Sequence, residues 1–249
     1  MIMPSKGKHT AAQRAVRRRA SPALVEHDPS LSDVAARAII DRVLSGRCVP
    51  GQRLTEGDLA RELKVGRGTI REALKRLTAE RVVALIPHRG AFVRALTREE
   101  VLQLQDVVKA LYGMATSLAA AQIHLGNNRR RLTAAYERLC SGGPQSDRIL
   151  HAIDRGSFYD VIFSICGNQE LLRVNPAVLI QILRMQVHPF LSADDLRELF
   201  SDYRLLYDAI IDGDGKKAAR VFETHIRRRR TQLERLPAEA FADESGQPR

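Results

Sequence analysis

Residues Pro50–Val93 decide the fold, and they read PGQRLTEGDLARELKVGRGTIREALKRLTAERVVALIPHRGAFV. Thr55 is a suitable N-cap for a short helix that ends at Leu63, with Leu59 and Leu63 on its inner face. A tight turn over 64–66 leads into a second helix, which the pattern predicts over 67–77. The apolar residues of this second helix recur at helical spacing, at Ile70, Ala73, Leu74 and Leu77. Two helices joined by so short a turn indicate a helix-turn-helix.

The outer face of the second predicted helix is basic, and a hairpin with a basic tip follows it. The apolar stripe must face the other helices, so the remaining side chains point outward. Residues 82–86 and 91–93 have strand periodicity and flank the turn at 87–90, which forms a wing. A solvated basic face is the alternative, but a wing beside the helix favours DNA. The predicted DNA contacts are Arg67, Gly68, Thr69, Arg71 and Lys75 on the helix and His88, Arg89 and Gly90 in the wing.

This stretch resembles the DNA-binding domain of the GntR family of bacterial transcription regulators. The resemblance rests on the turn between the two helices, the spacing of the helices, the arginines Arg67 and Arg71, and the wing. The resemblance implies a regulator, most often a repressor, that binds a palindromic DNA operator as a homodimer. It also implies that Arg67 and Arg71 contact bases or phosphates. One departure is Gly57, which stands where many relatives carry Arg or Glu, so one phosphate contact would be absent.

The net positive charge of the chain is concentrated in its N-terminal part. Residues 1–95 hold 19 basic and 9 acidic side chains, a net charge of +10, whereas residues 96–249 hold 21 and 20, a net charge of +1. Lys and Arg bind the phosphates of nucleic acids by releasing counterions. The basic segment 6–19 lacks the large apolar face that membrane binding needs. The charge therefore favours DNA over a membrane as partner.

Composition limits the class of protein. A chain of 249 residues can hold two domains, and 44% hydrophobic residues without tryptophan are typical of helical cores. The three cysteines are isolated, which indicates neither a disulfide framework nor a zinc finger. No secretory signal or membrane span is apparent, so we expect a cytoplasmic protein. We predict disordered segments at 1–30 and 237–249 and a DNA-binding domain at 31–95.

From Thr97 the pattern is helical. Thr97 and Glu100 have the spacing of a capping box that opens a long helix, which ends before Gly126. Further helices are predicted at 128–140, 147–166, 168–188, 193–212 and 215–235. The fold class is therefore mainly α: a winged helix-turn-helix followed, at 96–236, by an antiparallel all-α bundle. Such a bundle can enclose a cavity between its helices, and we expect it to carry the dimer interface.

The bundle resembles the FCD ligand-binding domain of the FadR subfamily of GntR regulators. The resemblance rests on Ala119–Ala120, Phe158 before Gly167–Asn168, the Gly213–Asp214 turn and His225. Most such domains hold a divalent metal with one Asp and three His. At the corresponding positions this chain has Arg155, Tyr159, Tyr203 and His225, so three of the four ligands are missing. We expect no metal and no other cofactor, although a register shift of one residue would bring in Asp154.

Six residues are expected to line the effector cavity: Val108, Tyr112, Arg155, Tyr159, Tyr203 and His225. Arg155 could hold a carboxylate or phosphate, which makes an organic anion the expected effector. The alternative is that the tyrosines only fill space and that Arg155 points to solvent or pairs with Asp154 or Asp160. A ligand-independent architectural DNA-binding protein is the competing function. No catalytic arrangement is apparent, so we do not expect an enzyme.

Overall fold

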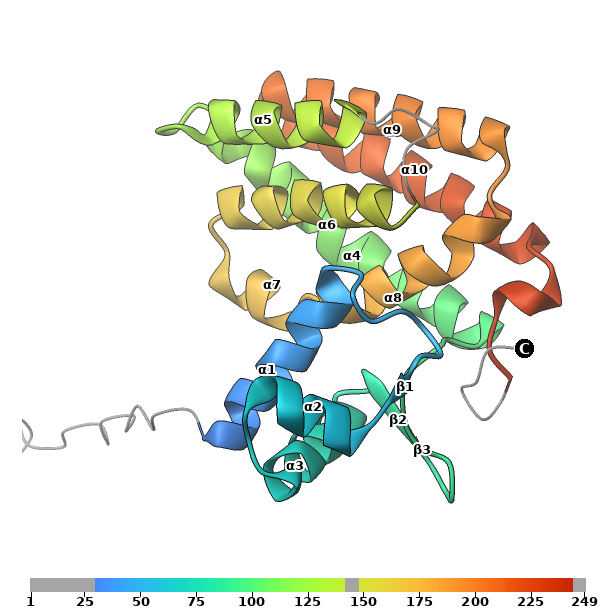
Figure 1. Ribbon diagram of the computed structural model, residues 1–249. Helices are drawn as coiled ribbons and strands as arrows, with labels where there is room; N and C mark the ends of the chain where they lie inside the picture. Colours follow the sequence, from blue (N-terminus) through green and yellow to red (C-terminus); the bar gives the residue numbers. More distant parts are fainter. Residues whose placement is uncertain (1–29, 142–147, 244–249) are drawn as a thin grey trace, which may run out of the picture. The chain divides into compact units, whose positions relative to one another are not determined.

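The structure is a computed structural model, and it describes residues 30–141 and 148–243 (Figure 1). The predicted N-terminal arm therefore lies outside the described residues, apart from Ser30. From Leu31 onward the described residues form one compact unit. Within them, every helix is too short or too polar to cross a lipid bilayer.

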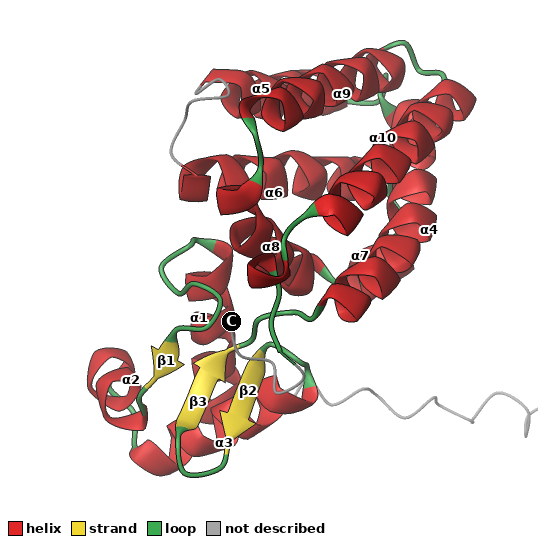
Figure 2. Ribbon diagram, turned by 90° about the vertical axis from the view of Figure 1, so that its right-hand side faces the viewer, coloured by secondary structure: helices red, strands yellow, loops and turns green. Residues whose placement is uncertain are grey.

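The first part of this unit is a winged helix-turn-helix. Its helices are α1 (Leu31–Leu44), α2 (Glu56–Leu63) and α3 (Arg67–Ala79), and its strands are β1 (Arg53–Leu54), β2 (Val83–Ile86) and β3 (Gly90–Val93). The strands form an antiparallel sheet in the order β1-β3-β2 (Figure 2). Both predicted helices and the hairpin are confirmed. The strand β1 was not predicted, because a strand of two residues is too short to show a period.

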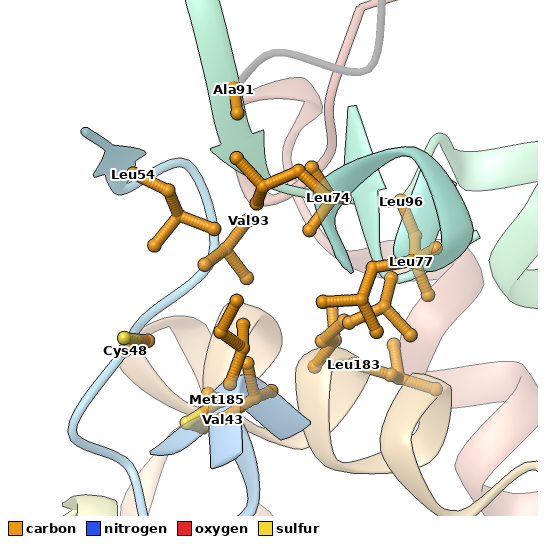
Figure 3. Packing of buried hydrophobic residues seen from close by; sticks show 14 of the residues in the cluster. Val43, Cys48, Leu54, Leu74, Leu77, Ala91, Val93, Leu96, Leu183 and Met185 are labelled. Atoms are coloured by element: carbon orange, nitrogen blue, oxygen red, sulfur yellow. The ribbon is translucent and has the colours of Figure 1, made fainter. Parts of the chain in front are cut away.

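The apolar stripe predicted on the second helix is buried. Ile70, Ala73, Leu74 and Leu77 are each at most 2% exposed and pack with α1 and the sheet. Figure 3 shows Leu74 and Leu77 in this core together with Leu183 and Met185, which come from a helix of the bundle. Thr55 occupies the predicted N-cap of α2, but its hydroxyl bonds to the Asp58 carboxylate and caps no backbone N–H.

The second part is a bundle of α-helices. Its members are α4 (Arg98–Gln122), α5 (Asn128–Ser141), α6 (Arg148–Ile165), α7 (Gln169–Val174), α8 (Ala177–Val187), α9 (Ala193–Ile211) and α10 (Gly215–Arg235). The helices α4 and α10 lie side by side (Figure 2). The capping box between Thr97 and Glu100 is confirmed at the start of α4.

The prediction of a single helix over 168–188 is wrong. The chain forms α7 and α8 with a break at Asn175 and Pro176, where Asn175 has a ψ of 118°. Proline disfavours helical backbone in the residue before it and has no N–H to donate, so it ends the first helix and begins the second.

The prediction of a disordered segment from residue 237 is wrong for Pro237–Asp243. Residues 238–240 form a 3₁₀ turn, and Phe241 is 3% exposed in the core that the first domain shares with α8. The Ala242 N–H donates to the Leu96 carbonyl. The guanidinium of Arg98 lies over the Phe241 ring, 4.3 Å from its centroid. Aromatic burial and these contacts order a segment that looks polar in sequence, and residues 244–249 lie outside the described part.

Gln186, on α8, ties this C-terminal segment to the link between the two domains. Its amide accepts from the Leu96 N–H and donates to the carbonyls of Leu96 and Ala240, at 2.8–2.9 Å. Replacing Gln186 by Leu is expected to lower the free energy of unfolding by about 1–3 kcal/mol, because backbone groups lose their partners. Urea denaturation measures this, with Gln103→Leu on the exposed face of α4 as control. Equal stability of the two variants would contradict the assignment.

Candidate DNA-binding face and effector cavity

The helix α3 presents the predicted DNA contacts on its exposed face. Arg67, Gly68, Arg71 and Lys75 are exposed, and Thr69 is half-buried. Arg71 makes a two-pronged ion pair with Glu56 at the start of α2, with Nε and Nη2 donating at 3.1 and 2.9 Å. The hydrogen bonds from Arg71 lower the pKa of Glu56, which keeps that carboxylate charged. Glu56 therefore holds the Arg71 guanidinium in one orientation on this face.

The tip of the wing is a tight turn. The Arg89 N–H donates to the Ile86 carbonyl at 3.0 Å, and His88 has a φ of 60°, as the third residue of a type II turn requires. Gly90 follows with a φ of 97°. All three wing residues that the sequence predicted as DNA contacts are exposed: His88, Arg89 and Gly90.

Gly57 lies beside the same face. A Cβ atom at this position would come within 3.8 Å of the Arg67 guanidinium. A larger residue here would therefore contact Arg67, whereas glycine leaves that side chain room to move. Gly57 is thus a neighbour of a predicted DNA contact.

The bundle encloses a cavity of about 70 Å³ between α4, α6, α8, α9 and α10. All six residues predicted for the effector site line it: Val108, Tyr112, Arg155, Tyr159, Tyr203 and His225. Water needs roughly 10–15 Å³ of such space per molecule, so the cavity could hold on the order of five waters or a small organic molecule. Most of the other lining side chains are aliphatic.

Arg155 points into the bundle and not to solvent. It is 8% exposed, and its Nε donates to the Tyr203 hydroxyl at 2.6 Å. The rings of Tyr112, Tyr159 and Tyr203 form a chain of edge contacts beside it, with centroids 4.9 and 6.1 Å apart. Burial raises the pKa of Tyr112 to about 12, so its hydroxyl stays protonated and donates to Asn175. The cavity thus combines the Arg155 guanidinium with tyrosine hydroxyls.

His225 is neutral and fixed by a neighbouring carboxylate. Burial lowers its pKa to about 4, and its Nδ1 lies 3.0 Å from Asp202 Oδ2. Asp202 is itself 3% exposed and also accepts from Arg228 at 2.5 Å. Burial alone would raise the pKa of Asp202, but the bond from His225 and the nearby arginines lower it overall. Asp202 is therefore an anion whose charge is already matched.

Two further arginines that were not predicted from the sequence line the cavity, Arg184 on α8 and Arg229 on α10. Arg184 is 7% exposed and lies over the Tyr159 ring, 5.3 Å from its centroid. Burial, and then the charge of Arg155, lower the pKa of Arg184. Arg184 is the one charged residue in the helix AVLIQILRMQV, and this isolation was the available signal. Arg229 was hidden in the run of four arginines at 227–230.

Two sequence families match the two parts of the chain. Residues 31–93 match the family described as "Bacterial regulatory proteins, gntR family", and residues 103–228 match the FCD domain. The chain belongs to the GntR family of bacterial regulatory proteins. Both expected resemblances are thereby confirmed.

This GntR-family chain has relatives that share most of its length. It is 25% identical over 189 residues to the "Probable D-xylose utilization operon transcriptional repressor" of Paenarthrobacter nicotinovorans, covering 76% of this chain and 82% of that one. It is 24% identical over 193 residues to the HTH-type transcriptional repressor GlaR of Escherichia coli K12, covering 74% and 87%. The structure of E. coli McbR/YncC matches with a TM-score of 0.68 at 19% identity, over 82% and 97% of the two chains. That likeness shows a shared fold.

The residues at the family's metal position do not fit a metal in this GntR-family chain. Arg155 cannot act as a ligand, and its guanidinium already bonds to the Tyr203 hydroxyl. His225 faces Asp202, which is paired with Arg228. Within residues 30–141 and 148–243, no three side chains from His, Cys, Asp and Glu gather as a metal site. One imidazole beside a matched carboxylate is too small a ligand set.

The purified protein is therefore expected to contain no stoichiometric transition metal. Elemental analysis of the protein after dialysis tests this, and treatment with a chelator should leave its thermal midpoint unchanged. One equivalent of Zn, Ni or Mn per chain that disappears in His225→Ala would contradict the expectation. Such a result would show that His225 is a ligand and that other donors complete the site.

Proposed function

We propose that this chain is a ligand-responsive transcription repressor. Residues 31–95 would bind a palindromic operator, and residues 96–236 would hold a small organic anion and form the homodimer. The two relatives are both named as transcriptional repressors, which supports repression and not activation. The exposed basic face of α3 with its wing supports DNA binding. A regulator acting on DNA also fits a cytoplasmic location.

The anion is supported by the unmatched charge of the cavity. Among the described residues, no carboxylate lies within ion-pair distance of Arg155 or Arg184, although both guanidiniums are buried. A buried charge without a counter-charge costs several kcal/mol. An anionic ligand would supply the missing charge and gain charge-assisted hydrogen bonds. This uncompensated charge is the single observation that carries the effector proposal.

The helix α8 offers a route from the cavity to the DNA-binding part. Arg184 and Val187 line the cavity, whereas Met185 packs in the core that contains Leu74 and Val93 (Figure 3). Gln186 on the same helix bonds to Leu96 in the link between the domains. A ligand that shifts Arg184 would therefore act on the DNA-binding domain through the single helix α8. Such a shift requires that the ligand bind more tightly to one arrangement of the DNA-binding domain than to the other.

Dimerisation would follow from the size of the DNA-binding part, because one winged domain covers too little DNA for specific binding. The bundle offers exposed apolar side chains for an interface. Val107 and Met114 lie two turns apart on α4 and are 47% and 54% exposed. A twofold dimer would place two recognition helices on the two halves of a palindrome.

Selection from a random duplex library with the full chain tests the DNA-binding proposal. We expect an enriched palindrome, bound by two chains, with an affinity that falls steeply as salt rises. Light scattering of the complex gives the number of chains. Enrichment of no sequence would contradict a repressor and would favour a ligand-independent architectural protein. An enriched sequence without twofold symmetry, bound by one chain, would contradict the dimer.

A further inference from the structure

We propose that Arg53 on β1 is a further DNA contact, which binds the phosphate backbone beside the wing. The proposal rests on the proposed DNA-binding function and adds a residue outside α3 and the wing. Three observations carry it. Arg53 lies on the uncovered face of the sheet, its guanidinium reaches the tip of the wing, and no acidic side chain of the described residues pairs with it.

The three-stranded sheet has one buried and one uncovered face. Leu54 on β1 and Ala91 and Val93 on β3 are buried in the core beneath the sheet. Because side chains alternate along a strand, Arg53 and Phe92 point to the opposite face. They are paired across β1 and β3, and Arg53 is exposed whereas Phe92 is half-buried. In Figure 2 the uncovered face is turned to the viewer, with α3 behind the sheet.

The Arg53 guanidinium lies beside the tip of the wing. A Cβ atom at Gly90 would stand 3.8 Å from both Nε and Nη2 of Arg53. Glycine has no Cβ atom, so this position leaves the guanidinium uncovered. The Arg89 guanidinium lies 5.8 Å from the centroid of the Phe92 ring, and Phe92 is the cross-strand neighbour of Arg53. Two guanidiniums therefore border this side of the wing.

The charge of Arg53 is not matched by an acidic side chain in the part of the chain that the structure describes. Other exposed arginines of the DNA-binding domain are matched, because Arg61, Arg71, Arg76 and Arg81 each form an ion pair with a carboxylate. Arg53 can therefore bind a phosphate without first breaking an ion pair. Its guanidinium presents parallel N–H donors that fit two oxygens of one phosphate.

The place of Arg53 in the sheet favours a phosphate over a base. Neighbouring strands are about 4.8 Å apart, so Arg53 stands one strand away from the hairpin that forms the wing. When the tip of the wing enters a groove of the duplex, the strand beside it lies over the rim of that groove. Phosphates form the rim, and contacts to them position a protein on DNA without reading its sequence.

A phosphate contact differs from a base contact in its dependence on salt. Each phosphate that a cation neutralises changes the slope of log K against log [salt] by about 0.9, because counterions are released. Arg53→Gln should therefore make this slope less steep by about 0.9 for each bound chain. It should weaken binding of the operator and of an unrelated duplex by the same factor, roughly three- to tenfold for each bound chain at about 0.1 M salt.

Fluorescence anisotropy of labelled duplexes, titrated with the full chain at several salt concentrations, tests the proposal. The probes are the palindrome selected from the random library and an unrelated duplex of the same length. Arg47→Gln is the matched control, since Arg47 is also exposed but follows Gly46, at which a Cβ atom would meet Ile149 of α6. It should keep the natural slope. Arg53→Lys should also keep it, because an ammonium still binds a phosphate.

The outcomes separate the proposal from the proposed function. An unchanged slope in Arg53→Gln would overturn the proposal and leave DNA binding by α3 and the wing standing. Weaker binding of the operator alone would also overturn it, because Arg53 would then contact a base. Binding of neither duplex by the natural protein would contradict both.

The thermal midpoint shows whether Arg53 has a role in the stability of the sheet. Arg53 is exposed, so we expect Arg53→Gln to unfold at the same temperature as the natural protein. A loss of affinity at an unchanged midpoint supports the phosphate contact. A lower midpoint together with an unchanged slope would assign Arg53 to the sheet instead.

Discussion

Replacing Arg155 by Ala is expected to weaken binding of a carboxylate effector roughly ten- to a hundredfold and to leave operator affinity unchanged. Arg155 is buried in the cavity wall, bonds to Tyr203 and has no carboxylate partner among the described residues. Its charge is therefore available to a ligand. Titration calorimetry with adipate and hexanoate measures the loss, and Arg130→Ala on the exposed face of α5 is the control.

The stability of an Arg155 variant separates a ligand-binding residue from a structural one. Arg155→Met removes a buried charge that has no counter-charge, so the free energy of unfolding without ligand should stay unchanged or rise. A decrease of more than about 2 kcal/mol would indicate a structural network through Tyr203. Ligand should stabilise the natural protein against heat and should not stabilise the variant.

Replacing Arg71 by Ala is expected to weaken operator binding roughly ten- to a hundredfold. Arg71 is exposed on α3, and its guanidinium is oriented by Glu56. If it contacts a base, the variant should also tolerate changes at one operator position. If it contacts a phosphate, affinity should fall for all sequences alike.

The measurement is a gel-shift titration at fixed salt with the selected operator and with versions altered at single positions. Arg197→Ala, an exposed arginine of α9 with an acidic partner three residues away, controls for the change in net charge. Glu56→Gln should weaken binding less than Arg71→Ala, because it removes the orientation and keeps the guanidinium. Equal operator affinity of Arg71→Ala and the natural protein would contradict the assignment.

The sequence predicted the DNA-binding part well, because its signals are local. The buried face of α3 is formed by the apolar residues Ile70, Ala73, Leu74 and Leu77. Once the buried face of a helix is known, the residues on its outward face are known as well. Spacing from the landmarks at Asn168 and His225 also predicted Arg155, Tyr159 and Tyr203. Together with His225, and with Val108 and Tyr112 from the family resemblance, these residues line the cavity. What these residues bind stays a prediction.

The remaining features depend on contacts between distant parts of the chain. Arg184 is seven residues after Ala177 in an apolar helix, and nothing local shows that its neighbour in space is Arg155. Phe241 lies in a polar segment and is buried only because Arg98, Gln186 and the shared core meet there. The periodicity of a single sequence does not reveal contacts between residues that are far apart in the chain.

An anion in the Arg155 cavity is proposed to control DNA binding. The most direct test measures the fluorescence anisotropy of a labelled operator bound to the natural protein or to Arg155→Ala. Mono- and dicarboxylates are added to each complex at constant ionic strength. We predict that at least one carboxylate changes the operator affinity of the natural protein at least about tenfold and has no effect on Arg155→Ala. Operator affinity that no carboxylate changes, or that changes equally in both proteins, would contradict the account.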